Sequence, residues 1–159
     1  MKKIVILLII ACTACEQQSQ TATSADRFID LYQVRTDFDA FLELYAEDMV
    51  LQDMITGYEA NGKDAFAAFF NWPDERFQKL HEKTLIVQRL IVQENEAVIS
   101  GYFTPFMWDS ATVEAMQFTT LLRFNEEQQI TLHQDWINYP NDLIDYSSRA
   151  NSNEWIRLD

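Results

Sequence analysis

The sequence predicts a single α+β domain in which three helices precede an antiparallel sheet. In the first half of the chain, apolar residues recur at the spacing of three to four that places them on one face of a helix. From Lys83 onward the spacing changes to two, which is typical of strands. Helices followed by a run of strands favour helices packed on one face of a sheet. We expect this sheet to be strongly curved, with a ligand pocket in its concavity.

Three segments carry the helical pattern. In the first, Phe28, Leu31 and Tyr32 fall on one face. The second begins after Thr36 with a start that resembles a capping box, and Pro73 stops the third. We therefore expect helices over residues 25–35, 36–48 and 63–70, and a short helical turn over 74–81.

The strand pattern fills most of the remaining chain. Asn95, Asp109 and Asn125 stand at the turns between apolar, β-branched runs, and Pro140 ends the last run. The sequence therefore predicts a short strand over 49–53 and four longer strands over 84–93, 97–106, 113–124 and 130–139.

The N-terminus has the pattern of an export signal. Lys2 and Lys3 precede an apolar run over residues 4–11, which is shorter than the roughly 20 residues of a membrane-spanning helix. Both cysteines, Cys12 and Cys15, lie at its end, where a lipoprotein signal places the cysteine that carries the lipid. The position before the polar segment favours Cys15, Cys12 remains an alternative, and so does an ordinary cleaved signal. We expect a lipoprotein signal over 1–14, a flexible tether over 15–24 and one domain over 25–159.

The charge of the chain limits its partners. The chain has 159 residues, of which 25 are acidic and 12 are basic, so its net charge is −13. Loss of Lys2 and Lys3 with the signal brings the net charge to −15. Such a surface disfavours nucleic acids and anionic lipid headgroups, so membrane attachment would come from the lipid alone. We expect an exported lipoprotein of the bacterial cell envelope, on the periplasmic face of the outer membrane.

Metal and cofactor sites are not predicted. His81 and His133 are the only histidines, and both cysteines lie in the signal, whereas zinc sites use three or four such ligands. The sequence has neither a glycine-rich phosphate loop nor the Gly-x-Ser-x-Gly pattern of serine hydrolases. Nucleotide-dependent and serine-hydrolase activities are therefore disfavoured.

Several segments together resemble a known family. Residues 37–50, Asp-Phe-Asp-Ala-Phe-Leu-Glu-Leu-Tyr-Ala-Glu-Asp-Met-Val, are followed by Gly-Lys-Asp-Ala-Phe at 62–66 and Phe-Phe at 69–70. Leu-Arg-Phe-Asn at 122–125 and His-Gln-Asp-Trp at 133–136 come later. In this order and spacing they resemble the nuclear transport factor 2-like superfamily, in its SnoaL-like branch. The resemblance implies a cone-shaped α+β fold with a pocket at its open end, often dimeric through the sheet. The superfamily includes isomerases, cyclases, dehydratases and epoxide hydrolases, and also members without catalysis.

Asp53 is the first candidate for catalysis. The resemblance places it where the ketosteroid isomerase branch has its general base, although Met54 stands where that branch has proline. The alternative is an aspartate that caps a turn at a strand end. The branch also needs oxyanion donors, but the matching positions hold Ile29 and Thr120. Tyr32 could supply a hydroxyl only if it faces the pocket, so steroid-type isomerase chemistry is disfavoured.

His133 and Asp135 form the second candidate. They are two residues apart on a strand and share a face, so they could act as an acid–base pair, as a late-strand aspartate does in the cyclase branch. The alternative is that both are solvated, with Leu132 and Trp136 facing inward. The pattern favours this alternative, with Trp136 in the core or the pocket wall.

Aromatic residues at one strand end, Tyr102, Phe106 and Trp108, could ring the mouth of a pocket for an apolar ligand. The sequence favours a lipid-anchored, non-catalytic module that binds a small apolar molecule or a partner, and a homodimer through the sheet fits the resemblance. The alternative is a cofactor-free isomerase, cyclase or dehydratase with Asp53 as base, assisted by His133 and Asp135. The expected ligand-binding residues are Tyr32, Tyr102, Phe106, Trp108, Phe118, Thr120 and Trp136.

Overall fold

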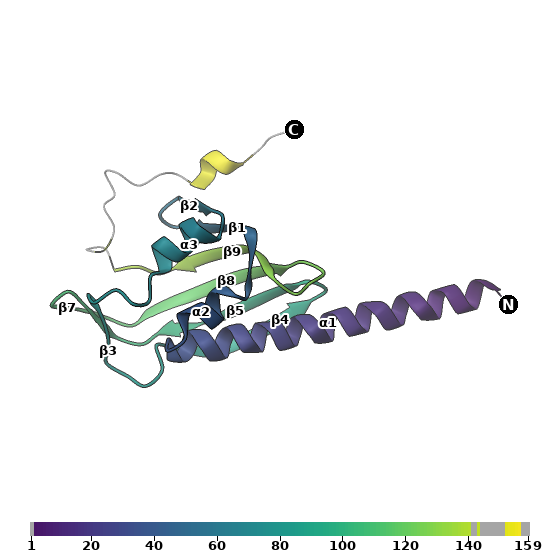
Figure 1. Cartoon of the computed structure of the whole chain (residues 1–159), viewed down its shortest axis with the longest axis horizontal. Coiled ribbons are helices and arrows are strands. Elements are labelled where there is room, and N and C mark those ends of the chain that lie inside the picture. The colour runs from purple at the N-terminus through teal and green to yellow at the C-terminus, as the bar shows by residue number, and fades with distance from the viewer. Residues whose placement is uncertain (1, 141–142, 144–151, 157–159) are drawn as a thin grey trace.

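The computed structural model describes residues 2–140, 143 and 152–156, and it has the predicted α+β organisation (Figure 1). The helices are α1 (Lys2–Val34), α2 (Phe38–Leu42), α3 (Lys63–Phe70) and the short 3-10 helix η2 (Ser152–Trp155). The strands are β1 (Tyr45–Asp53), β2 (Tyr58–Asn61), β3 (Phe77–Lys79), β4 (Leu85–Gln93), β5 (Glu96–Phe103), β6 (Phe106–Trp108), β7 (Ala111–Val113), β8 (Met116–Phe124) and β9 (Ile130–Ile137).

The main sheet has six strands in the order β2-β1-β9-β8-β5-β4. It is mixed, which corrects the expectation of a purely antiparallel sheet, because β1 pairs in parallel with β9 while the other neighbours are antiparallel. It is also not strongly curled. The predicted strand over 97–106 is interrupted at Pro105, which cannot donate a backbone hydrogen bond. The chain then forms a separate small sheet, β3-β6-β7.

Helix α1 runs along β4 and β5 and extends beyond the sheet toward the N-terminus (Figure 1). It includes residues 15–24, so the expected flexible tether is helical instead. One contact and one buried residue show that this segment docks on the sheet. The side chain of Gln18 donates a 3.1 Å hydrogen bond to the carbonyl of Val92, and Thr21 is fully buried.

The second helix is much shorter than expected, whereas the third has the expected bounds. Asp37, rather than Thr36, caps α2 by accepting a 2.9 Å hydrogen bond from the backbone of Ala40. The helix ends early because Tyr45 already pairs with Ile130 as the first residue of β1. The turn expected over 74–81 contains β3 instead of a helical turn.

The core between the helices and the sheet is rich in aromatic rings. Phe41 packs against Trp72 with ring centroids 4.3 Å apart, and Tyr45 packs against Phe66 at 4.2 Å. Phe41, Tyr45 and Phe66 are fully buried. Burial of each such ring contributes about 1.5–3 kcal/mol. This packing joins α2, α3 and the start of β1 in one core.

A bulge in β9 decides which of its side chains face inward. Phe124 pairs with Ile130 and Arg123 pairs with Leu132, so Thr131 is an extra residue in the ladder. After it the alternation shifts by one, and His133 and Asp135 are buried while Trp136 is 38% exposed. The expectation that Leu132 and Trp136 face the core is therefore wrong, because strict alternation does not anticipate the extra residue.

Candidate functional site

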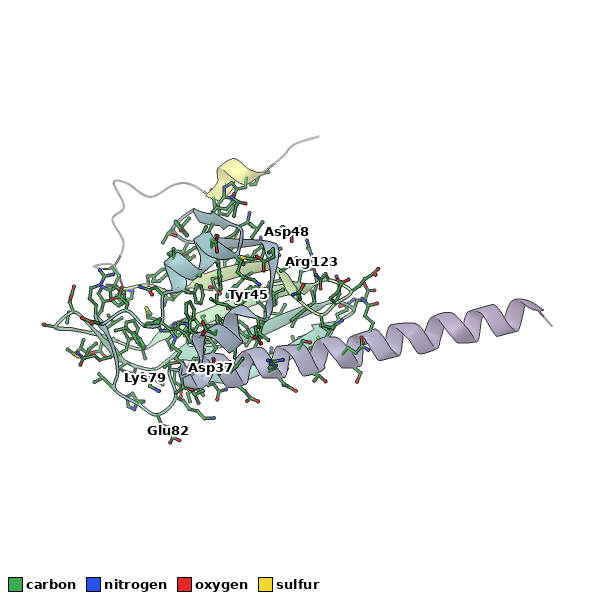
Figure 2. All side chains as sticks on the ribbon, in the orientation of Figure 1. Asp37, Tyr45, Asp48, Lys79, Glu82 and Arg123 are labelled. Carbon is green, nitrogen blue, oxygen red and sulfur yellow. The ribbon has the colours of Figure 1, made fainter. Side chains whose placement is uncertain are left out.

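A cavity of about 560 Å³ lies between the end of α1, helix α3, the main sheet and the small sheet. Most of its lining is apolar. Its carboxylates come from the main sheet and from Asp74, and its cations are Arg35 after α1, Arg76 before β3 and Lys79 in β3. Figure 2 draws the side chains of these elements and labels one lining residue, Lys79. The aromatic residues of its lining are Tyr32, Phe69, Phe70, Phe77, Phe103, Phe106, Trp108 and Tyr139.

Two carboxylates line the cavity from adjacent strands. Asp53 ends β1 and Asp135 lies in β9, and the two are direct partners in the parallel ladder. They are only 3% and 6% exposed. The structure thus brings together two of the three predicted catalytic residues at one wall of one cavity. Buried carboxylates need hydrogen-bond donors, and their partners indicate what each can do.

Both oxygens of Asp53 accept hydrogen bonds. Oδ1 accepts from the backbone amides of Ile55 and Thr56 at 2.9 and 3.0 Å, which is the turn-capping role considered from the sequence. Oδ2 accepts from the Tyr139 hydroxyl at 2.7 Å. Burial and then the Asp53 charge raise the pKa of Tyr139 far above its usual value, so the phenol keeps its proton. Tyr139 was not predicted as a site residue, because the sequence showed it only as the last residue of the predicted strand over 130–139.

Asp135 belongs to a buried polar chain. Its Oδ1 accepts a short hydrogen bond from Thr120. Its Oδ2 lies 3.1 Å from Nε2 of His133, at an angle that makes an electrostatic contact rather than a hydrogen bond. Nδ1 of the fully buried His133 lies 3.0 Å from the Tyr45 hydroxyl.

The tautomer of His133 decides the direction of its hydrogen bond with Tyr45. Burial, followed by the Tyr32 and Asp135 groups, raises the pKa of Tyr45 well above its usual value, so the hydroxyl stays protonated. When Tyr45 donates to Nδ1 of His133, the imidazole carries its proton on Nε2, toward Asp135. Asp135 is thus the member of the chain that lines the cavity, and His133 lies behind it.

The seven predicted ligand-binding residues occupy different places. Tyr32, Phe106 and Trp108 line the cavity. Phe118 and Thr120 are buried but are not among its lining residues.

Tyr102 and Trp136 lie on the opposite face of the sheet, which corrects their expected place at the pocket. In β5 the strand alternation turns Phe103 toward the cavity and Tyr102 away from it. Trp136 lines a second, shallower hollow on the outer face, together with Gln88 and Ser100.

Three cations line the cavity. Arg76 forms a salt bridge with Asp74 at 2.6 Å and lies over the Trp108 ring. Hydrogen bonds from Arg76 lower the pKa of Asp74 to about 2. Lys79 donates to the carbonyl of Val34 at 2.7 Å. Arg35 donates to the Tyr32 hydroxyl at 3.3 Å.

Within the described residues, no group of three or more histidine, cysteine, aspartate or glutamate side chains could hold a metal ion. The two adjacent aspartates of the cavity alone are fewer ligands than structural zinc or calcium sites use. In the same part of the chain, no helix is long and apolar enough to cross a membrane.

The chain matches the family model of the SnoaL-like domain over residues 25–133. No curated protein sequence matches it closely enough to count as a relative. Among solved structures, it is similar to a candidate SnoaL-like polyketide cyclase from Shewanella denitrificans. The two have a TM-score of 0.63 and 16% identity, over 74% of this chain and 90% of that one.

Two further solved structures have the same fold. An LEH-like epoxide hydrolase from M. tuberculosis has a TM-score of 0.60 and 14% identity, over 76% of this chain and 84% of its own. An NTF2-like protein of unknown function from Burkholderia xenovorans has a TM-score of 0.61 and 11% identity, over 90% of this chain and 98% of its own. At these identities the similarity concerns the NTF2-like fold, which the described elements share.

Proposed function

Because this chain belongs to the family of SnoaL-like domains, we propose that its cavity binds one small, largely apolar molecule. The observation that carries this proposal is a cavity of about 560 Å³ walled by aromatic rings. Its volume lies within the range of roughly 300–1,000 Å³ that is common for small-molecule sites. A few polar groups, above all Asp53 and Asp135, would orient the molecule within these walls.

A blocking substitution tests this proposal. Ala68 is exposed on α3 and lines the cavity, so Ala68→Trp would fill its entrance without overpacking the core. Ala111→Trp is the matched control, because Ala111 is exposed but does not line the cavity. The probe is 2-acetylnaphthalene, a neutral aromatic ketone, and its binding is measured by isothermal titration calorimetry.

We expect the wild type and Ala111→Trp to bind the probe with equal affinity, and Ala68→Trp to lose at least tenfold. The reason is that a tryptophan at the entrance competes with the probe for the same aromatic walls. If the wild type does not bind the probe, or Ala68→Trp binds it equally well, the cavity is not the binding site.

A second candidate function is cofactor-free proton transfer of the isomerase, cyclase or dehydratase type. The observation that favours it is the buried chain from Tyr45 through His133 to Asp135. In this candidate, Asp135 rather than Asp53 exchanges a proton with the substrate. Both oxygens of Asp53 are already occupied by three donors, including Tyr139. A positioned acid–base group of this kind contributes about 10²–10⁴ in rate.

Deuterium exchange tests the second candidate without knowledge of the substrate. The probe is 2-tetralone in D₂O, an apolar ketone with exchangeable C–H bonds, and exchange is followed by NMR. Asp135→Asn should lose the exchange that the wild type catalyses, while Asp109→Asn, an exposed control outside the cavity, should keep it. Wild-type exchange no faster than that of buffer would leave ligand binding as the function.

A further inference from the structure

The ligand class can be narrowed further, on the premise that the cavity is a binding site. We infer that the ligand carries an anionic group, such as a carboxylate, that pairs with Arg35. This residue lines the cavity at the end of α1. The inference rests on three observations: how Arg35 is held, which hydrogen bond its side chain makes, and how the other charges of the cavity are balanced.

The guanidinium group of Arg35 is held in place by aromatic rings. Arg35 directly follows α1 and has a φ of 49°, the left-handed conformation that ends a helix. Its backbone amide donates to the carbonyl of Leu31 at 3.0 Å. The guanidinium carbon lies 4.9 Å from the ring centroid of Tyr32, 4.7 Å from that of Phe77 and 5.6 Å from that of Trp72. A cation fixed in this way loses little conformational entropy when it binds an anion.

Among the described residues, the Arg35 side chain makes one hydrogen bond. The guanidinium has five N–H donors, and Nη2 donates to the Tyr32 hydroxyl at 3.3 Å. Nε is buried and has no hydrogen-bond partner. In the described part of the chain, no carboxylate lies within salt-bridge distance of Arg35, although the chain is strongly acidic. An incoming carboxylate would accept hydrogen bonds from the Nη donors that have no partner among the described residues.

The other charged groups of the cavity already have partners. Arg76 pairs with Asp74, and Lys79 donates to a backbone carbonyl. Asp53 accepts three hydrogen bonds, and Asp135 accepts one from Thr120 and faces His133. A cationic ligand would have to compete with these donors for the carboxylates. Arg35 has no carboxylate partner among the described residues, so an anionic ligand would supply its counter-charge.

A matched pair of probes separates this inference from the proposed function. The probes are 2-naphthoate and 2-acetylnaphthalene, which share a ring system and differ in the charge of one similarly shaped group. Isothermal titration calorimetry on the full chain measures both. The variants are Arg35→Gln and Arg35→Lys, and the control is Arg89→Gln, which removes an exposed cation outside the cavity.

We expect the wild type to bind 2-naphthoate at least tenfold more tightly than the ketone, because a charge-assisted hydrogen bond of about 1.5–3 kcal/mol corresponds to roughly 10–100-fold. Arg35→Gln should remove this preference, Arg35→Lys should retain part of it, and Arg89→Gln should leave it unchanged. Ketone binding should persist in all variants, which also shows that they fold. Equal binding of both probes by the wild type, or a preference that survives Arg35→Gln, would overturn the inference. If the wild type does not bind the ketone, the proposed function itself is overturned.

Discussion

Three tyrosines in and beside the cavity have hydroxyl groups whose pKa values are raised. Burial is the largest cause for Tyr32, whose pKa rises to about 12, and for Tyr45 and Tyr139, whose pKa values rise well above the usual range. In the unfolded chain these phenols titrate near about 10. The folded state therefore holds protons that the unfolded state releases at alkaline pH.

This difference predicts a loss of stability in alkali. Below about pH 10 both states are protonated, and the stabilisation is fully present. As the pH rises from about 10 toward 12, the unfolded state loses protons first, so the free energy of unfolding falls. Urea denaturation between pH 8 and pH 11.5 measures this decline, and ultraviolet absorbance of phenolate follows the titration. Native-state titration of all six tyrosines near pH 10 would contradict the account.

Some residues of the candidate site could be predicted from the sequence, and others could not. Asp53 could be found because it lies at the end of a strand in a family-like pattern, and the structure places it in the cavity wall. Tyr139 could not, because its role depends on a contact with a residue 86 positions earlier. Arg35 could not either, since no local pattern indicates a cation that lacks a carboxylate partner after folding.

Among the secondary-structure elements, β9 shows most clearly why sequence periodicity alone does not predict which side chains face the core. The strand itself follows from its alternating, β-branched sequence, but one extra residue, Thr131, reverses the faces beyond it. The bulge depends on the pairing of β9 with β8, and this pairing cannot be read from the sequence of β9 alone. Similarly, the interruption at Pro105 follows from local chemistry, whereas the separate small sheet depends on β3, a segment that the sequence indicated as a helical turn.

The docking of helix α1 on the sheet predicts that its backbone amides exchange slowly. Because Thr21 is buried and Gln18 contacts β4, the backbone amides of residues 21–34 should be protected from hydrogen exchange. Amide exchange followed by NMR measures this protection, and the exposed turn at Glu126–Glu127 is the internal control. If the amides of residues 21–24 exchange as fast as those of this turn, the segment is a flexible tether rather than a docked helix.

For the whole molecule, the arrangement of the N-terminus and the cavity bears on its attachment to a membrane. We propose that the protein is an exported lipoprotein with its lipid on Cys15, as its N-terminal sequence suggests. The N-terminal end of α1 and the cavity-lining strand β3 lie at opposite ends of the long axis in Figure 1. Cys15 precedes by three residues Gln18, which contacts Val92 near the end of β4, so a lipid on Cys15 would attach at that end of the sheet and present the cavity away from the membrane.

Lipid attachment is tested by metabolic labelling in a bacterial host. Radiolabelled palmitate should be incorporated into the wild type and Cys12→Ser, and it should be absent from Cys15→Ser. Labelling should also place the wild type in the membrane fraction. Label that depends on Cys12 would move the attachment site by three residues, and an unlabelled wild type would contradict the lipoprotein proposal.

The proposed function and the inferred role of Arg35 together require a small molecule to enter the aromatic cavity with its anionic group at Arg35. The most direct test is a crystal structure of the protein with 2-naphthoate. The account predicts the naphthalene ring between Phe103 and Phe106, with the carboxylate within hydrogen-bond distance of the Arg35 guanidinium. A naphthoate bound only on the outer face of the sheet beside Trp136, with the cavity unoccupied, would contradict it.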